Sequence, residues 1–374
     1  MAHTATRLVR TGVVAVATLA LTACTLTGNG DETAGDGTDS APAGEDSSAA
    51  DTEDGGDSGG TLTVVTHDSF ALSEELLSGF EAETGYTLET VAPGDAGALV
   101  NQLVLTADSP LGDVVYGIDN AFAARAVGAD VLAPYTPADQ PASADAYDLG
   151  DTLTPVDMGD VCLNVDHRWF AEHDVPEPQT FADLTEEDYR DLTVVTNPAT
   201  SSPGLALLLA TVDEFGEDGW QDYWRDLDAN GLKVVDSWSD AYYVDFSGSE
   251  GAGERPIVLS YASSPAAEVP ESGGEPRTGA LLSTCFRQVE YAGVLAGAEN
   301  PQGARAFVDF LVSTPVQEDI PGQMYMYPVD DSVDLPQAWR QHAPLAEEPR
   351  AVDPATVDAN REDWIAAWRE IVVG

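Results

Sequence analysis

The chain has 374 residues, with 66 Asp and Glu against 15 Lys and Arg, and its formal net charge at pH 7 is −51. A charge of this sign repels the phosphates of nucleic acids and of anionic membrane surfaces, which excludes both as partners of the folded protein. It would favour a cationic ligand, although surface carboxylates also keep a protein soluble in a salty medium, and we attribute most of them to that role. Because the chain is too long for one small hydrophobic core, we expect two folded lobes.

The N-terminus has the pattern of an export signal that ends at a lipidation site. Arg7 and Arg10 precede an apolar run at residues 11–21, which is too short to span a bilayer. The run ends in the sequence Leu-Thr-Ala-Cys, which resembles the lipobox of bacterial lipoproteins. We therefore expect residues 1–23 to be a signal peptide, and Cys24 to carry a lipid that anchors the exported protein to the outer face of the cell membrane.

Residues 24–60 have the composition of a disordered acidic tether. Beyond Cys24 they are dominated by Gly, Ser, Ala, Thr, Asp and Glu and contain no aromatic and no basic residue. Such a segment cannot bury enough apolar surface to offset the entropy of ordering, so it should act as a flexible spacer between the lipid and the folded part.

The first folded lobe is predicted as alternating strands and helices. Three strands and two helices are expected in the order strand, helix, strand, helix, strand at residues 62–66, 72–84, 88–91, 98–107 and 113–116. This alternation indicates an α/β fold with a parallel sheet covered by helices. Ligands bind such sheets at the carboxyl ends of the strands, where Asp68, Asp95 and Asp119 lie in this sequence.

A second set of α/β elements begins near residue 161. Its strands are expected at residues 192–196, 233–235 and 257–261, with a helix at about 204–215. An apolar strand at 286–295 would return to the first lobe, and helices at 303–312 and 360–371 would close the chain. We therefore expect lobe 1 to comprise residues 61–160 and about 283–312, and lobe 2 to comprise residues 161–282 and about 313–374.

The sequence contains no pattern for catalysis or for a metal site. Its five histidines lack metal-ligand spacing, and nucleotide-binding loops, hydrolase elbows and dinucleotide fingerprints are missing. Ser201 or Ser263 would be the nucleophile of an exported serine hydrolase, but neither has a His or Lys base nearby in the sequence. We predict no catalytic residue, no cofactor and no metal.

Cys162 and Cys285 are the cysteines that remain after Cys24. An exported protein folds in an oxidising compartment, and each of the two lies where we expect the chain to cross between lobes. We predict a disulfide between them; the alternative is two separate buried thiols.

Several short sequences along the chain occur in a recognisable order. They are Asp-Ser-Phe at 68–70, Gly-Asp-Ala-Gly at 94–97, Gly-Ile-Asp-Asn at 117–120, Pro-Ala-Thr-Ser-Ser-Pro-Gly at 198–204, Trp-Ser-Asp-Ala-Tyr at 238–242, Leu-Ser-Tyr-Ala-Ser-Ser-Pro at 259–265 and Met-Tyr-Pro-Val at 326–329. Together they resemble the thiamine-binding substrate-binding proteins of bacterial ABC transporters, over about residues 62–368. The resemblance implies the type II periplasmic-binding-protein fold, a two-lobed clamshell with a hinge and a ligand cleft between the lobes.

The resemblance also implies a set of ligand residues for thiamine or thiamine phosphates. The hydroxyethyl or phosphate end would meet the segments around Asp95 and Ser201, the rings would stack near Trp238 and Tyr261, and Asp68 would face the cationic end. The complete expected set is Asp68, Asp95, Ala96, Gly97, Asp119, Ser201, Ser202, Trp238, Tyr242, Tyr261, Ser263, Ser264 and Tyr325. For three of these residues a structural role stays open: Ser202 and Asp119 would also suit helix caps, and Trp238 would also suit a core.

The chain departs from the family pattern at three positions. His67 stands where a tyrosine is common, Tyr325 where a tryptophan is frequent, and Ala267 where some members have an aromatic residue. The physics of the remaining residues agrees with thiamine, because a cation over a Trp or Tyr face gains about 0.5–2 kcal/mol.

We therefore expect a monomeric extracytoplasmic binding protein that closes around thiamine and delivers it to an ABC transporter permease. Two other functions stay open. The first is a binding protein for Fe(III) or another small solute on the same fold, for which Tyr242 and Tyr243 would supply hard oxygen ligands. The second is the exported serine hydrolase.

Overall fold

The computed structural model describes residues 59–249, 253–270 and 272–374. The predicted signal peptide, the lipidation site at Cys24 and the tether up to residue 58 lie outside the described residues. Within the described part, no helix is both long enough and apolar enough to cross a membrane.

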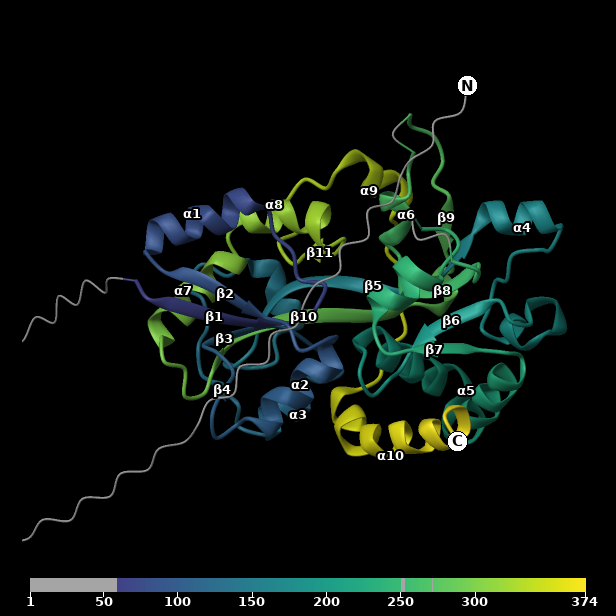
Figure 1. The fold of residues 1–374 in the computed structure, drawn as a ribbon, viewed down its shortest axis with the longest axis horizontal. Helices are drawn as coiled ribbons and strands as arrows, with labels where there is room; N and C mark the ends of the chain where they lie inside the picture. Colours follow the sequence, from purple (N-terminus) through teal and green to yellow (C-terminus); the bar gives the residue numbers. More distant parts are fainter. Residues whose placement is uncertain (1–58, 250–252, 271) are drawn as a thin grey trace, which may run out of the picture. The chain divides into compact units, whose positions relative to one another are not determined.

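One mixed β-sheet passes through the described part (Figure 1). Its main path runs in the order β2 (Thr87–Val91), β1 (Thr61–Thr66), β3 (Val114–Asp119), β10 (Phe286–Leu295), β5 (Thr154–Asp166), β8 (Ile257–Tyr261), β6 (Thr193–Thr196) and β7 (Lys233–Val235). Three short strands join this path at its middle, β4 (Leu132–Ala133) on β10, and β9 (Thr278–Ala280) and β11 (Tyr327–Pro328) on β5. The strands near each end of the path pair in parallel, as the strand–helix alternation predicted.

Strands β5 and β10 connect the two lobes (Figure 1). β10 pairs antiparallel with β3 of the first lobe and with β5, and β5 continues to pair antiparallel with β8 of the second lobe. The crossing strand at residues 286–295 was predicted, but β5 was only expected to begin near residue 161 and in fact begins at Thr154. Two strands that cross between lobes form the hinge of the clamshell.

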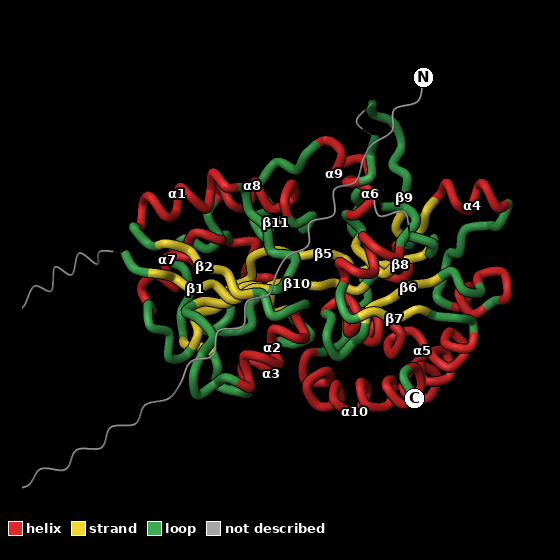
Figure 2. Tube along the Cα trace, in the orientation of Figure 1, coloured by secondary structure: helices red, strands yellow, loops and turns green. Residues whose placement is uncertain are grey.

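The first lobe is a sheet covered on both faces by helices (Figure 2). Its helices are α1 (Glu74–Thr84), α2 (Ala96–Leu105), α3 (Ala123–Gly128), α7 (Pro301–Leu311) and α8 (Thr314–Gln323). In β1, Val64 packs in a cluster with Phe307, whereas Val65 packs in another cluster with Leu99. Burial of both faces explains why this strand is a β-branched run without polar alternation.

The second lobe contains α4 (His167–His173), α5 (Ser202–Ala229), α6 (Ser264–Ala267), α9 (Gln337–His342) and α10 (Pro354–Val372). α5 is longer than the predicted helix at 204–215, because a second helical stretch follows a break at Gly216, whose φ of 69° favours glycine. Trp220 and Trp224 on that stretch are buried, and they extend the hydrophobic core of the second lobe.

The end of the first lobe lies further along the chain than expected. Val316 and Ile320 of α8 pack in the same cluster as Leu62 of β1, and the Gln317 amide donates to the carbonyl of Val156 at 2.9 Å. Residues 313–323 therefore pack with the first lobe, whereas the sequence placed them in the second. The remaining division of the chain between the lobes stays a prediction.

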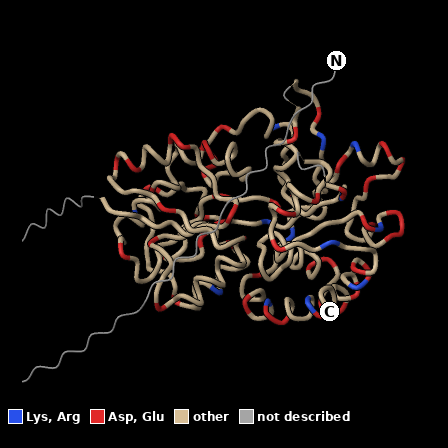
Figure 3. Tube along the Cα trace, viewed as in Figure 1, with Lys and Arg blue, Asp and Glu red and all other residues tan. Residues whose placement is uncertain are grey.

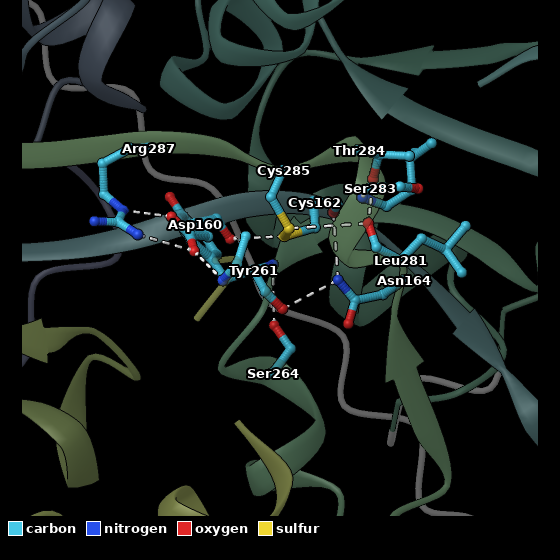
Figure 4. The surroundings of a disulfide bond; sticks show 12 residues. Asp160, Cys162, Asn164, Tyr261, Ser264, Leu281, Ser283, Thr284, Cys285 and Arg287 are labelled. Atoms are coloured by element: carbon cyan, nitrogen blue, oxygen red, sulfur yellow. Dashed lines mark hydrogen bonds and ion pairs between the residues drawn. A yellow bond between two sulfur atoms is a disulfide. The ribbon is translucent and has the colours of Figure 1, made fainter. Parts of the chain in front are cut away.

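A disulfide joins Cys162 of β5 to Cys285, which directly precedes β10 (Figure 4). The predicted pairing is confirmed, and the Cα atoms of the two cysteines are 4.2 Å apart. Beside it, the Arg287 guanidinium pairs with the carboxylate of Asp160 at 2.5 Å. The bond closes a loop with a sequence separation of 123 residues, for which chain entropy gives a stabilisation of about 4–5 kcal/mol.

Acidic residues are spread over both lobes, and basic residues are sparse in the first (Figure 3). Arg125 is the one Lys or Arg between residues 59 and 167 in the sequence, and residues 283–323 add Arg287 and Arg305. The first lobe therefore presents a strongly negative field to an approaching ligand.

Candidate functional site

A cavity of about 300 Å³ has walls from both lobes. Its volume is at the lower end of the range for small-molecule sites, about 300–1,000 Å³. The lining residues are His67, Ser69, Asp95, Pro203, Trp238, Tyr242, Tyr243, Tyr261, Ser264, Ala267, Glu268, Glu290, Met324, Tyr325 and Met326. Aromatic rings and carboxyl groups dominate this set, and it contains no Lys and no Arg.

The second lobe supplies the aromatic wall. A single π-helical turn at Asp240–Asp245 places Tyr242 next to Trp238, and the two rings stack with centroids 5.1 Å apart and an interplanar angle of 19°. Tyr261 at the end of β8 meets Trp238 edge-on at 6.2 Å. The Trp238 indole N–H donates to Ser260 at 3.0 Å, which fixes the ring. These rings offer faces on which a flat cation could stack.

Asp95 lies on the first-lobe side of the cavity and contacts both lobes. One carboxylate oxygen caps α2 by accepting from the N–H of Ala96 at 2.6 Å, and the other accepts from the N–H of Trp238 at 3.2 Å. Burial raises the pKa of Asp95, while hydrogen bonds from Ser201 and Ala96 act in the opposite direction. The residue thus lines the cavity, as expected, but its oxygens bind backbone amides of this chain.

Glu290 is the main site residue that the sequence analysis missed. It lies on β10, is 4% exposed and lines the cavity. One carboxylate oxygen accepts from the amide of Gln288 at 2.8 Å, and the other accepts from the hydroxyl of Tyr116 at 2.8 Å. A signal existed, because Gln288 and Glu290 fall on the same face of a largely apolar strand.

His67 follows β1 and packs against Glu290. Its Nε2 lies 3.3 Å from a Glu290 oxygen, and its Nδ1 accepts from the N–H of Ser69 at 3.1 Å, so the proton of the neutral ring lies on Nε2. Burial lowers the pKa of His67, but the charge and hydrogen bond of Glu290, together with the charges of Asp95 and Asp68, raise it, and the net pKa is above its ordinary value. His67, which stands where a tyrosine is common in the family, therefore lines the cavity.

Four predicted residues line the cavity besides Asp95 and Trp238; they are Tyr242, Tyr261, Ser264 and Tyr325. Ser264 hydrogen-bonds the hydroxyl of Ser260 at 2.8 Å. Tyr325 has a positive φ of 57°, a conformation that costs a side chain free energy and that recurs at binding sites. Ala267 also lines the cavity, so the small residue at this position enlarges it.

The other predicted ligand residues lie outside the cavity lining. Asp68 is exposed, Ser263 is buried, and the remaining residues are packed between the lobes; these are Ala96, Gly97, Asp119, Ser201 and Ser202. At Gly97 a Cβ would meet the backbone of Thr200 at 2.8 Å, so only glycine permits this close approach of the two lobes. These segments hold the lobes together at the edge of the cavity.

Asp119 closes the turn that leads into α3, and Ser201 caps α5. One oxygen of Asp119 accepts from the N–H groups of Ala121 and Phe122 at 3.0 and 2.8 Å, and its other oxygen accepts from the hydroxyl of Ser202. Ser201 is the N-cap of α5 and Ser202 is its first residue. Burial raises the pKa of Asp119 to about 7. The N-cap of α3 is Phe122, so Asp119 closes the turn before this helix instead of capping it, and the N-cap of α5 is Ser201 instead of Ser202.

Neither the metal nor the hydrolase alternative has a matching cluster in the described residues. No group of three or more His, Cys, Asp or Glu side chains in them could hold a metal ion. The hydroxyl oxygens of Ser201 and Thr196 are 2.8 Å apart, and the hydroxyl of Ser263 has no hydrogen-bond partner among the residues that the structure describes. Tyr242 donates to Glu268 at 3.0 Å.

A two-lobed α/β fold, hinged by crossing strands and enclosing a cavity with walls from both lobes, defines the class of type II periplasmic binding proteins. Residues 109–349 match the family described as "Bacterial extracellular solute-binding protein". The chain belongs to this family of solute-binding proteins.

Curated relatives and a solved structure that resemble this chain are also solute-binding proteins. The chain is 32% identical to the thiamine-binding periplasmic protein of Salmonella typhimurium over 318 residues, which cover 83% of this chain and 93% of the relative. It is 30% identical to the protein of the same name from Brucella suis over 316 residues, or 82% and 91% of the two chains. A solved "Periplasmic thiamin binding protein" superposes with a TM-score of 0.73 and 31% identity over 83% of this chain and 96% of that one.

The fold extends to more distant proteins. Iron-bound HitA from Pseudomonas aeruginosa superposes with a TM-score of 0.65 at 20% identity, over 83% of this chain and 99% of that one. At this identity the likeness concerns the fold alone. A role in solute binding follows from the family, and the relatives are binding proteins rather than enzymes.

Proposed function

We propose that this protein captures thiamine outside the cell and delivers it to an ABC importer. The main observation behind the proposal is the composition of the cavity. Stacked aromatic rings of one lobe and buried carboxyl groups of the other lobe line the same small cavity. The relatives that share about a third of its residues over most of the chain are named for thiamine binding.

Thiamine fits this chemistry, since it combines a flat aminopyrimidine, a permanently charged thiazolium and a short alcohol. The ring faces of Trp238, Tyr242 and Tyr261 suit the flat rings, and a cation over such a face gains about 0.5–2 kcal/mol. The negative field of the first lobe favours entry of a cation. Closure of the lobes would expel water and strengthen these attractions.

The hinge supplies the delivery mechanism. A ligand that touches both lobes binds the closed form better than the open one, and so it shifts the population toward closure. We propose that a monomer in the closed form is the species that a permease accepts. The disulfide between Cys162 and Cys285 supports export to an oxidising compartment.

The proposed attachment is a lipid on Cys24, followed by the acidic tether. Cys24→Ser should release the full-length protein from membranes into the medium, and the released protein should still bind thiamine. A Cys24→Ser protein that stays in the membrane fraction would contradict the lipid anchor.

Native mass spectrometry of the mature protein, purified from a medium that contains thiamine and iron, tests the ligand. We expect an adduct with the mass of thiamine. An iron adduct would support the Fe(III) alternative, and a protein without adduct that hydrolyses ester substrates would support the hydrolase.

A further inference from the structure

The floor of the cavity contains a buried chain of three oxygen-bearing side chains from three central strands. The hydroxyl of Tyr116 on β3 lies 2.5 Å from a carboxyl oxygen of Asp157 on β5 and 2.8 Å from a carboxyl oxygen of Glu290 on β10. Tyr116 and Asp157 are fully buried, whereas Glu290 reaches the cavity.

The two contacts require a proton besides that of the hydroxyl. A tyrosine hydroxyl carries one hydrogen, so it donates to one carboxyl oxygen and must accept from the other. One of the two carboxyl groups is therefore a neutral carboxylic acid. Two ionised carboxylates on one hydroxyl in a buried site would also repel each other strongly.

The surroundings decide which group is ionised. Glu290 is surrounded by donors, from Gln288 on one oxygen and from Tyr116 and His67 on the other. Asp157 has an oxygen without a hydrogen-bond partner among the described residues, which a buried carboxylate would not tolerate but a neutral acid does. Burial opposes ionisation of both groups, but the pKa of Asp157 is raised well above its ordinary value and that of Glu290 is lowered by His67 and the donors. Asp157 therefore donates to Tyr116, and Tyr116 donates to an ionised Glu290.

We infer that Glu290 is the residue that selects a positively charged ligand, and that Asp157, as a neutral acid, and Tyr116 position its carboxylate. This inference rests on the proposed function, because it names the group that would meet the thiazolium charge. The family resemblance implied this role for Asp68, which is exposed and does not line the cavity.

Two other carboxyl groups line the cavity and are engaged differently. Asp95 binds the backbone N–H groups of Ala96 and Trp238, and Glu268 accepts from the hydroxyl of Tyr242. Glu290 combines burial, a neutral acid behind it and a place on a hinge strand. When the His67 ring is neutral and donates from Nε2, the pair keeps a net charge of −1, which acts in a medium with little water. Coulomb attraction to a cation is much stronger there than at an exposed carboxylate.

The test varies the charge of the ligand and the charge of residue 290 independently. Calorimetry measures the binding of thiamine and of its thiophene isostere, in which carbon replaces the charged ring nitrogen, to the full-length wild type, to Glu290→Gln and to Glu83→Gln. Gln is close in shape to Glu, and Glu83 is an exposed residue of α1 that serves as the matched control.

We expect the wild type and Glu83→Gln to prefer thiamine over the isostere by at least about thirtyfold. In Glu290→Gln, thiamine should bind about thirtyfold more weakly and the isostere no more weakly than before, so that the preference falls to within about threefold. A Glu290→Gln protein that keeps the wild-type preference would overturn the inference. A wild type that binds neither compound would contradict the proposed function, whereas equal binding of both compounds by the wild type would contradict charge selection alone.

The position of the proton is tested separately by infrared spectroscopy, which needs no ligand. The carbonyl stretch of a protonated carboxylic acid should persist at pH 8, disappear in Asp157→Asn and remain in Glu290→Gln. In Asp157→Asn, an amide N–H can replace the acid O–H toward Tyr116, so the preference for thiamine should be retained. Loss of the preference in Asp157→Asn but not in Glu290→Gln would assign the charge to Asp157 and refute the inference.

Discussion

A carboxylate oxygen of Asp95, the N-cap of α2, accepts a hydrogen bond from the backbone N–H of Trp238 at 3.2 Å and so joins the two lobes beside the cavity. The N–H of Ala98 donates to the carbonyl of Thr200 at 3.0 Å across the same boundary. These contacts can form only when the lobes are close together, so they contribute to the stability of the closed form.

Asp95→Asn should weaken closure without removing the helix cap. Asn caps a helix about as well as Asp, but its amide nitrogen cannot accept from the N–H of Trp238. We expect thiamine affinity to fall by about 1–2 kcal/mol, or roughly five- to thirtyfold, in calorimetric titration. Asp68→Asn, at an exposed neighbouring carboxylate, is the control and should change the affinity less than about threefold. Equal effects of the two substitutions would show that general charge, not closure, matters.

Asp119→Asn should make the protein more stable at alkaline pH. The folded-state pKa of Asp119 is raised by burial to about 7, so between about pH 4 and 7 the folded chain keeps a proton that the unfolded chain loses, and stability falls as pH rises. Asn can still accept from the N–H of Phe122 and can donate to Ser202, and it carries no charge. Denaturant unfolding should show a gain of about 2–4 kcal/mol at pH 8 that vanishes toward pH 4.

Asp183→Asn is the control with the opposite sign. Backbone amides of Gln179 and Thr180 lower the pKa of this half-buried carboxyl, so the stability that it contributes is present at neutral pH and is lost as pH falls through the folded-state pKa. This substitution should therefore destabilise the protein at pH 8. A gain in stability from both substitutions would refute the assignment of the Asp119 effect to its buried charge.

Trp238→Ala should weaken thiamine binding by about 1–3 kcal/mol and leave thermal stability nearly unchanged, because the half-buried ring lines a cavity. Trp224→Ala is the matched control, since that ring is 0% exposed in the core of the second lobe. It should lower the free energy of unfolding by about 3–5 kcal/mol. If Trp238→Ala instead lowers the melting temperature as much as Trp224→Ala while the affinity stays constant, Trp238 is a core residue.

Thiamine and thiamine monophosphate should bind within about tenfold of each other, or 1.4 kcal/mol, and the diphosphate should gain nothing further. The lining residues include no Lys and no Arg, and Arg287 is engaged with Asp160. The start of α5 would favour an anion by about 0.3–1 kcal/mol, but the field of the acidic protein opposes it. Calorimetry of all three compounds at one salt concentration measures this. A hundredfold preference for the diphosphate would show that a basic residue reaches the ligand.

Several local features could be predicted because neighbouring residues determine them. Gly85 ends α1 in the left-handed conformation, and the apolar run at 286–295 is β10. The start of α5 was predicted to within one residue, because its cap is Ser201 and not Ser202. The disulfide could be predicted because Cys162 and Cys285 are the pair that remains after Cys24. The order of the family sequences indicated the fold, and the aromatic residues Trp238, Tyr242 and Tyr261 do line the cavity.

The sequence by itself thus determined the class of fold, the approximate ends of the helices and the aromatic wall, since periodicity, turn chemistry and short motifs act over a few residues. It could not identify the carboxylate that faces the ligand. Asp157 lies 41 positions from Tyr116 in the chain, and Glu290 lies 174 positions from it. Each of the three alone resembles an ordinary strand residue. Only the pairing of β3, β10 and β5 brings their oxygens together. The ionisation of a buried carboxyl group depends on the donors and charges that the tertiary structure places within a few ångströms of it.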